Sequence, residues 1–426
     1  MISFYKLLIG IILHHPYHYF YMYRGTWIGV SMKKGHMNLP VILTAIILFI
    51  LLVLISVFTI SGSFLHTAYL DPWKKTYQNR FDDPRLKLTA HGLLAANGHN
   101  MQPWKIKLEE ENSSVFYLYA DSSKSTPAVD PYARQMMITQ GCFLEYLKIA
   151  GEKLGTPVTI TLFPDGVYDE DKLSTSMDTY PVAKITLDKA APQNTPLYDG
   201  IFLSDTNRGI YSKTQLSEDA VSTLTDTQEY PGISAFLYQA PDQVQSIGLI
   251  AMEAAEIEGN TTRVMKETED IFRSNEYQKN KYRYGFSVEG QGTKGIMKHF
   301  LQTIVSLFPS MNSGKAQTDN FIKSTRTSVE NTPAYLLLTT KDNTRTSQVE
   351  AGMLYSSYIL KAHSLGLAMQ PLSQALEEYM EMNTVYEKIH SQYGNGGTIQ
   401  MLLRVGYPKQ PVPLSMRQDI NSLLLK

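Results

Sequence analysis

The chain has 426 residues, of which 43% are hydrophobic and 19% charged, enough for one large or two medium globular units. Its 39 basic and 40 acidic residues give a net charge of -1, so no overall positive field attracts nucleic acid, and no nucleic-acid partner is predicted. Cys142 is the sole cysteine, which excludes an intrachain disulfide and a thiolate metal cluster within one chain.

The first predicted element is an uncharged run of 20 residues, VILTAIILFILLVLISVFTI, at positions 41–60. A helix rises about 1.5 Å per residue, so this run is long enough to span the ~30 Å hydrocarbon core of a bilayer. We therefore predict a single-pass membrane protein with one transmembrane helix. A cleaved signal peptide and a buried core helix are the alternatives. Signal-peptide cores usually have only about 7 to 15 apolar residues, which favours the anchor.

The charges around this run do not fix the side on which the soluble domain lies. Lys33 and Lys34 precede the run and no acidic residue occurs before Asp71, which favours a cytoplasmic N-terminus. Three basic residues between positions 74 and 80 oppose that reading. Met32 opens the stretch MKKGHMNLPV, so the first 31 residues are consistent with an upstream start codon that is not used. Residues 1–40 are accordingly treated as an N-terminal extension.

Residues 61–85 are interpreted as a Tyr-rich linker, and residues 86–200 as the first half of the soluble part. Hydrophobic spacing predicts a helix over 86–96 that ends near Asn97-Gly98, because glycine is a common helix stop. Alternating residues on both sides of positions 111–113 predict a hairpin over 104–120. A helix over 134–154, ended by Gly155, and two strands, TPVTITLFP and PVAKITL, complete this half.

Residues 201–426 form the second half. Here the spacing of apolar residues predicts helices over 217–224, 243–257, 262–273, 296–307, 348–365 and 374–389, and strands at PAYLLLTTKD and TIQMLLRVGYP. Helices and strands are interleaved throughout, which is typical of an α+β fold.

Three polar segments carry groups suited to ligand binding. NGHNMQPW supplies the amides of Asn100 and Gln102, which donate and accept hydrogen bonds and suit the edge of a heterocycle. SDTNRGIY supplies the Thr206 hydroxyl and the Arg208 guanidinium, a pair suited to phosphate. The segment from LLRVGYP to PLSMRQD adds further positive charge at Arg404 and Arg417. Each segment alone is equally typical of an ordinary polar turn or surface strand end.

Together, and in this order, the segments resemble a known family. The stretch AANGHNMQPW is similar to the Asn-x-Gln-Pro-Trp core of the nitroreductase superfamily of FMN-dependent oxidoreductases, although Asn97-Gly98 replaces its preceding Pro-Ser. The stretches TNRGIY, EAGMLYSSYILKAHSLGLAMQPL and LLRVGYP follow in the order of the single-chain, duplicated Acg-like branch. The resemblance covers about residues 86–420, most loosely over 228–331. It implies a tandem fold, in which two nitroreductase-like halves imitate a dimer around FMN.

The resemblance also implies roles for particular residues. Asn100 and Gln102 would contact the isoalloxazine edge or the ribityl chain, and Thr206 with Arg208 would open the second unit near the phosphate. Asp205 stands where the family often has a basic residue. The backbone of Gly366 to Pro371 would pass close to the flavin ring, and Arg417 would be a late phosphate-binding arginine. The full implied cofactor-binding set is Asn100, Gln102, Thr206, Arg208, Gly366, Met369, Gln370 and Arg417.

The implied activity is hydride transfer from NADH or NADPH through flavin N5 to a quinone, a nitroaromatic or another organic acceptor. The flavin performs the chemistry, so no catalytic side chain, metal or second chain is required. The alternative is a flavin-binding or flavin-sequestering protein with little turnover, covered by the middle segment. Two further patterns are given ordinary roles. GQGTKG at 290–295 lacks the preceding strand and the acidic residue of a dinucleotide site, so we interpret it as a loop. We interpret His91 and His99 as solvent-facing.

Overall fold

The computed structural model describes residues 18–23, 26–31 and 39–425. Contacts between residues divide the chain into one unit that ends at Ser56 and a second unit from Val57 to Lys426. Met32, Lys33 and Lys34, on which the start codon and the membrane orientation depend, lie outside the described residues.

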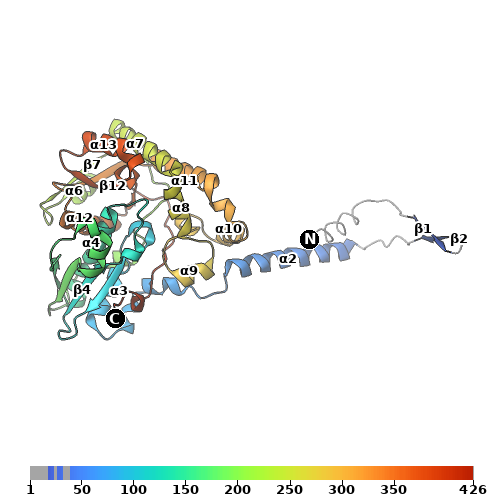
Figure 1. Ribbon diagram of the computed structural model, residues 1–426, viewed down its shortest axis with the longest axis horizontal. Helices are drawn as coiled ribbons and strands as arrows, with labels where there is room; N and C mark the ends of the chain where they lie inside the picture. Colours follow the sequence, from blue (N-terminus) through green and yellow to red (C-terminus); the bar gives the residue numbers. More distant parts are fainter. Residues whose placement is uncertain (1–17, 24–25, 32–38, 426) are drawn as a thin grey trace. The chain divides into compact units, whose positions relative to one another are not determined.

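The first unit contains a short hairpin and most of a long apolar helix. Strand β1 (His18–Tyr23) pairs with β2 (Thr26–Ser31) in antiparallel register. Helix α2 (Leu39–Ser61) contains the predicted run and is long and apolar enough to cross a membrane (Figure 1). Only Val57 and Ser61 of its residues are buried. An exposed apolar helix near the N-terminus is also what a signal sequence gives, so the anchor remains a prediction.

The predicted linker over 61–85 is a folded part of the second unit. It forms two short 3-10 helices, η1 (Ala68–Trp73) and η2 (Tyr77–Arg80). Tyr69, Trp73 and Tyr77 recur every four residues and are buried. The Trp73 indole donates to the Ser415 carbonyl at 2.8 Å and the Tyr77 hydroxyl to Asp419 at 3.2 Å. The aromatic residues that suggested a linker form a stripe that packs against the C-terminal segment.

The first half of the soluble part contains one antiparallel sheet of four strands in the order β3-β4-β6-β5. The predicted hairpin is confirmed, with Trp104 opposite Ala120. The predicted helix over 134–154 is confirmed at both ends. The elements are α3 (Pro84–Gly92), β3 (Trp104–Leu108), β4 (Val115–Ala120), α4 (Arg134–Leu154), β5 (Val158–Leu162), α5 (Leu173–Thr179) and β6 (Ala183–Leu187).

The second half contains a separate antiparallel sheet in the order β11-β12-β10-β7 (Figure 1). Every residue of its β10 strand is buried, as the apolar run predicted. Its strands and flanking helices are α6 (Glu218–Thr225), β7 (Ile233–Tyr238), α7 (Pro241–Asn260), α8 (Thr262–Asp270), β10 (Ala334–Thr340), α12 (Arg345–Ser364), β11 (Ala368–Pro371), α13 (Asn383–Tyr393) and β12 (Thr398–Gly406).

The middle of the chain, between α8 and β10, lies in the region whose sequence is least similar to the nitroreductase family, and it adds further helices and strands. Two-residue strands β8 (Phe272–Arg273) and β9 (Phe286–Ser287) pair in parallel. The helices here are α9 (Glu276–Tyr282), α10 (Ile296–Leu307) and α11 (Gly314–Glu330), of which only α10 was predicted.

Three predicted helices are wrong over part of their length, and buried arginines account for two of them. The helix over 262–273 ends at Asp270, and Phe272–Arg273 form strand β8 instead. The helix over 374–389 is broken into η9 (Ser373–Leu376), η10 (Met380–Met382) and α13. Arg134 takes the Leu376 carbonyl at 2.7 Å, which a continuous helix would need for its own hydrogen bond. Helix α3 ends at Gly92 rather than near residue 96. Just beyond this end, the Arg417 guanidinium donates a hydrogen bond to the Leu94 carbonyl at 2.7 Å.

The two halves meet where α4 crosses α12. A Cβ atom built on Gly141 would lie 1.8 Å from the Val349 carbonyl, and one on Gly352 would lie 1.9 Å from the Ile138 carbonyl. Each helix thus places a glycine against the backbone of the other. The α+β class is confirmed. The reciprocal crossing supports the tandem arrangement, which stays a prediction.

We expect Gly141→Ala and Gly352→Ala each to lower the free energy of unfolding by about 3 kcal/mol or more, because a methyl group must push two helix backbones apart. In an exposed helix the same change would instead stabilise by about 1 kcal/mol. Thermal unfolding of the detergent-solubilised full chain measures the effect. Gly232→Ala is the control, because nothing lies within 4 Å of a Cβ there. Equal melting temperatures for all three variants would contradict the crossing.

Candidate functional site

The polar loop that follows α3 has an unusual backbone. His99, Asn100 and Gln102 have φ values of 52°, 54° and 52°, in the left-handed region that residues other than glycine rarely adopt. Such strain persists only where surrounding contacts hold it, and it concentrates at functional sites. Here the Asn97 side chain accepts from the Gln102 amide at 2.9 Å, and the Thr139 hydroxyl accepts from the Gly98 amide at 3.1 Å.

The side chains of Asn100 and Gln102 are engaged within the protein. Asn100 donates to the carbonyls of Gly285 and Met416, both at 3.2 Å, and accepts from Arg417 at 2.9 Å. Gln102 is fully buried, donates to the Arg283 carbonyl at 2.9 Å and accepts from the Gln418 amide at 2.8 Å. Both amides therefore tie the loop to two distant segments. Their predicted contact with a flavin stays a prediction.

Those segments enclose a cavity of about 110 Å³. It brings together four of the predicted residues: Asn100, Thr206, Arg208 and Arg417. Its lining comes from four stretches of chain, 96–100, 204–208, 285–292 and 412–417, including Gly290 and Gly292 of the GQGTKG loop. We take this cavity as the candidate functional site.

The remaining predicted residues, Gln102, Gly366, Met369 and Gln370, do not line the cavity. Gly366 has a φ of 69° and precedes β11, whose residues Met369 and Gln370 are buried. The Met369 carbonyl accepts from the Asn207 amide at 2.9 Å. Strand β11 thus supports the stretch that carries Thr206 and Arg208, and its predicted proximity to a flavin ring stays a prediction.

Arg208 lines the cavity with an exposed side chain. Among the described residues, no hydrogen bond or ion pair engages its guanidinium, and the side chain keeps contact with solvent. Desolvation by the surrounding protein lowers its pKa, although arginine remains charged at neutral pH. An unpaired guanidinium in a recess is suited to an anionic ligand.

Arg417 behaves differently. Its guanidinium donates to Asn100 at 2.9 Å and to the Leu94 carbonyl at 2.7 Å, and it stacks 4.6 Å above the Trp73 ring. Burial lowers its pKa to about 10. Its predicted phosphate contact stays a prediction, since its terminal nitrogens already hold the loop in place.

Asp205 lines the same cavity as these two arginines. It is buried and accepts a hydrogen bond from the Tyr146 hydroxyl at 2.5 Å. Burial raises the pKa of its carboxyl to about 7. Near neutral pH the group is therefore protonated in part of the molecules, which weakens its repulsion of a bound anion.

Several buried polar atoms in the lining have no hydrogen-bond partner among the described residues: His99 Nδ1, Asp205 Oδ2, Glu289 Oε2 and Arg417 Nε. Unpartnered buried atoms are uncommon and suggest a missing ligand or water. His99 is half-buried, so it faces solvent only in part: its Nδ1 is buried, and burial lowers the pKa of the ring to about 4. The sequence could have indicated His99 as a residue of the site, because it directly precedes Asn100.

The structure also locates two of the residues considered in the sequence, His91 and Arg404, outside the cavity. His91 is buried, not solvent-facing, and hydrogen-bonds the Lys87 carbonyl and the Tyr198 hydroxyl. Arg404 is fully buried on β12, donates to the Ser328 carbonyl at 2.7 Å and stacks 3.7 Å over Tyr211. Both therefore serve the packing.

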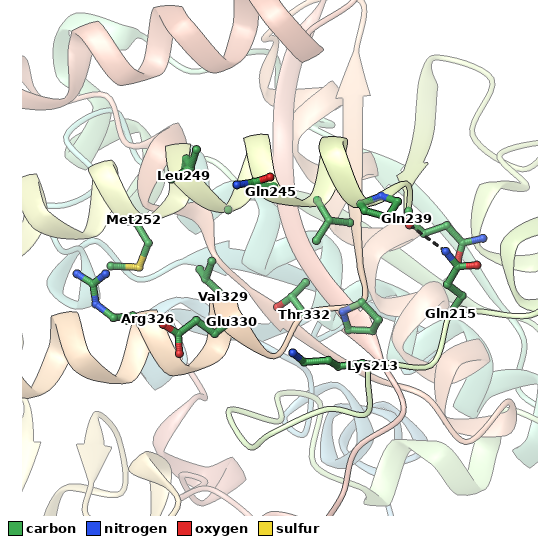
Figure 2. Close-up of a pocket in the computed structure, with 14 residues that line it drawn as sticks. Lys213, Gln215, Gln239, Gln245, Leu249, Met252, Arg326, Val329, Glu330 and Thr332 are labelled. Carbon is green, nitrogen blue, oxygen red and sulfur yellow. Dashed lines mark hydrogen bonds between the residues drawn. The ribbon is translucent and has the colours of Figure 1, made fainter.

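A larger cavity of about 540 Å³ lies between α7 and α11 (Figure 2). Apolar side chains such as Leu249, Met252 and Val329 line it, with Lys213 and Arg326 as its cations. None of the predicted site residues lines this second cavity. Within the described part of the chain, no cluster of three histidine, cysteine or acidic side chains is placed to hold a metal ion.

The sequence has relatives that bear on this site. The chain is 23% identical over 339 residues to "Putative NAD(P)H nitroreductase Rv3131" of Mycobacterium tuberculosis strain H37Rv, a match covering 78% of this chain and 88% of that protein. "Putative NAD(P)H nitroreductase MT3217" of strain CDC 1551 matches to the same extent. The resemblance to the nitroreductase superfamily is confirmed. No protein-family model matches the chain.

Solved structures of similar proteins include a nitroreductase with bound FMN from Desulfitobacterium hafniense, at 10% identity and a TM-score of 0.29, covering 53% of this chain and 96% of that one. The FMN-dependent nitroreductase NfnB from Mycobacterium smegmatis in complex with NADPH is 13% identical, with a TM-score of 0.30, covering 51% and 91%. At these values the structural similarity carries no argument for this chain.

We expect Asp205→Asn to flatten the pH dependence of stability. The folded-state pKa of Asp205, about 7, lies above its ordinary value of 3.8, so the folded chain holds a proton that the unfolded chain releases. The contribution of Asp205 to the free energy of unfolding is complete below about pH 4 and is lost as the pH rises toward 7. At pH 8 the asparagine variant should be more stable by ~1 kcal/mol or more. Melting temperatures at pH 5 and pH 8 test this, and identical slopes for both proteins would contradict it.

Proposed function

We propose that the chain is an FMN-dependent oxidoreductase that takes a hydride from NADH or NADPH and passes electrons to an organic acceptor such as a quinone or nitroaromatic. The unpaired Arg208 cation, next to the Thr206 hydroxyl, is the observation that carries this proposal. The names of the two mycobacterial relatives support the NAD(P)H-dependent chemistry.

The polar groups of the cavity fit the phosphate end of FMN. Arg208 would supply charge-assisted hydrogen bonds and Thr206 a hydroxyl, while partial protonation of Asp205 limits repulsion. The unpartnered His99 Nδ1 is neutral and available to a ligand. When bound, the flavin supplies the hydride chemistry, which explains why no acid-base dyad is needed.

The volume of the cavity sets a condition on this fit. About 110 Å³ is well below the roughly 300–1,000 Å³ of common ligand sites. The isoalloxazine ring therefore needs the wall at 285–292 to move outward. Asn100 holds that wall through two hydrogen bonds with Gly285, one donated by its side chain at 3.2 Å and one accepted by its backbone carbonyl at 3.0 Å. Asn100 thus positions the wall of the cavity.

The same wall favours the second candidate function, a flavin-sequestering protein with little turnover. A segment that closes over the ring would shield it from nicotinamide and from an acceptor. The two functions share the phosphate site and differ in whether reductants reach the ring.

We also propose that α2 anchors the protein in a membrane as a single span, because it is an exposed apolar helix of 23 residues. The electron acceptor would then be lipid-soluble or would reach the membrane surface. One chain contains the whole cavity, so a second copy is not required.

We expect Arg208→Ala to weaken FMN binding by roughly 10- to 100-fold, because a hydrogen bond to a charged group is worth about 1.5–3 kcal/mol and each 1.4 kcal/mol is tenfold. Arg326→Ala is the matched control, since this exposed arginine lines the other cavity. Titration of the purified full chain with FMN, followed by flavin fluorescence, measures both. A protein that never binds FMN would refute the proposal, and equal affinities for the two variants would refute the role of Arg208.

Anaerobic reduction separates the two functions. If the chain is an oxidoreductase, excess NADH or NADPH bleaches the flavin absorbance of the bound protein, and adding a quinone restores it. A flavin that dithionite reduces but neither nicotinamide bleaches would instead support sequestration.

A further inference from the structure

Helix α10 has its polarity reversed relative to a helix of a water-soluble domain. Its buried residues are Gln302 and Thr303, whereas Ile296, Met297 and Leu307 are each more than half exposed. Soluble domains bury the apolar face of an amphipathic helix and expose the polar one. The reversed arrangement shows that water is a poor environment for this face.

The exposed apolar residues lie at the two ends of the helix, with the half-buried Phe300 and Ile304 between them. Ile296 and Leu307 are eleven residues apart, about three turns at 3.6 residues per turn, and Met297 and Phe308 share the same spacing. The face therefore keeps one direction along the helix. The 3-10 turn η8 (Pro309–Asn312) extends it. We define the α10 apolar patch as Ile296, Met297, Leu307, Phe308 and Met311, each more than half exposed.

The polar face of α10 is attached to the C-terminal end of the predicted membrane span. The Thr303 hydroxyl donates to the Val57 carbonyl at 2.8 Å, and His299 hydrogen-bonds the Ser61 hydroxyl at 3.1 Å. The His299 ring also lies 5.4 Å from the ring of Phe58. Residues 57–61 are the last turn of α2, where a span leaves the hydrocarbon core. Helix α10 is thereby held at the depth of the lipid headgroups.

The charges near the patch suit an anionic lipid surface. No aspartate or glutamate occurs between Glu289 and Asp319, while Lys294 and Lys315 lie exposed in that stretch. Lys315 pairs with Asp319 at 3.0 Å, and Lys298 points away from the patch, because it pairs with Glu276 and Glu289. Apolar side chains flanked by lysines, with no acidic residue, are typical of helices that lie in the membrane interface. A second apolar contact accompanies them, because Phe64 is 78% exposed just after the span.

We propose that the α10 apolar patch is inserted into the interface of the bilayer that α2 crosses, as a second membrane contact of the soluble domain. This inference rests on the membrane span put forward under the proposed function and is independent of FMN binding. The occupant of the patch is the acyl and headgroup region of anionic lipid. The contact fixes the orientation of the domain on the membrane, which a single span with a flexible joint would not do.

The test uses the full chain in proteoliposomes of mixed phosphatidylcholine and phosphatidylglycerol. An environment-sensitive fluorophore is attached to one new cysteine at a time: Met297→Cys, Phe308→Cys, Ile47→Cys in the middle of α2, and Val167→Cys on a remote surface. Val167 is 81% exposed, and the native Cys142 is buried and does not compete for the label.

At positions 297 and 308 the emission of the label should be blue-shifted, and aqueous iodide should not quench it. Lipids that carry a nitroxide near the headgroup should quench most of this fluorescence. The label at position 167 should respond to iodide and not to the lipids, and the label at 47 to a nitroxide deep in the acyl chain. Iodide quenching at 297 and 308 equal to that at 167, with position 47 deep in the bilayer, would overturn the patch alone. A label at 47 that no lipid quenches would overturn the span itself, whereas the FMN titration is unaffected by either result.

Discussion

The contact between the two glycines of α4 and α12 is the constraint on which the rest of the structure depends. With Gly141 against the Val349 carbonyl and Gly352 against the Ile138 carbonyl, the helix axes approach as closely as two backbones allow. Both helices are almost wholly buried, so this crossing fixes the position of each half against the other. A left-handed glycine follows the end of each helix, Gly155 with a φ of 75° and Gly366 with a φ of 69°, and each lies fourteen residues beyond the contact glycine, since 155 - 141 and 366 - 352 are both 14. The equal spacing is what a repeated unit would produce.

Buried arginines then shape the loops around this frame by taking backbone carbonyls. Arg134 at the start of α4 binds the carbonyls of Leu376 and Gln400, Arg404 binds that of Ser328, and Arg417 binds that of Leu94. Each guanidinium offers five donors in a fixed plane, so one side chain satisfies several orphan carbonyls at once. Arg208 stands apart because the described residues give it no such partner. Arg134, Arg404 and Arg417 are buried and hydrogen-bonded to carbonyls, whereas Arg208 is exposed and has no such partner among the described residues, and this difference separates the structural arginines from the proposed ligand-binding one.

The sequence predicted the regular elements well and the loops poorly, for a physical reason. Helix 134–154, helix 296–307 and hairpin 104–120 follow from spacing that is local to each element. The break within 374–389 depends on Arg134, more than 240 positions away, and spacing cannot reveal it. For the site, the motif order identified Asn100, Thr206, Arg208 and Arg417, which the structure brings to one cavity. The left-handed backbone that turns Asn100 and Gln102 inward, and the partner of every arginine, are properties of the folded chain alone.

The middle segment connects the membrane face to the cavity through one network of charges. Glu276 on α9 is almost fully buried and accepts hydrogen bonds from Tyr69 at 2.6 Å, Lys298 at 3.0 Å and Gln302 at 2.9 Å. Lys279 bridges Glu276 to Glu289, and Glu289 lines the cavity. Lys298 and Gln302 belong to α10, so the helix that we place at the lipid surface and the wall that closes the cavity share a single ionic cluster. Removing one member of such a buried cluster would leave an unpaired charge and cost several kcal/mol. The cluster therefore holds α9, α10 and the cavity wall at Glu289 together as one packed body.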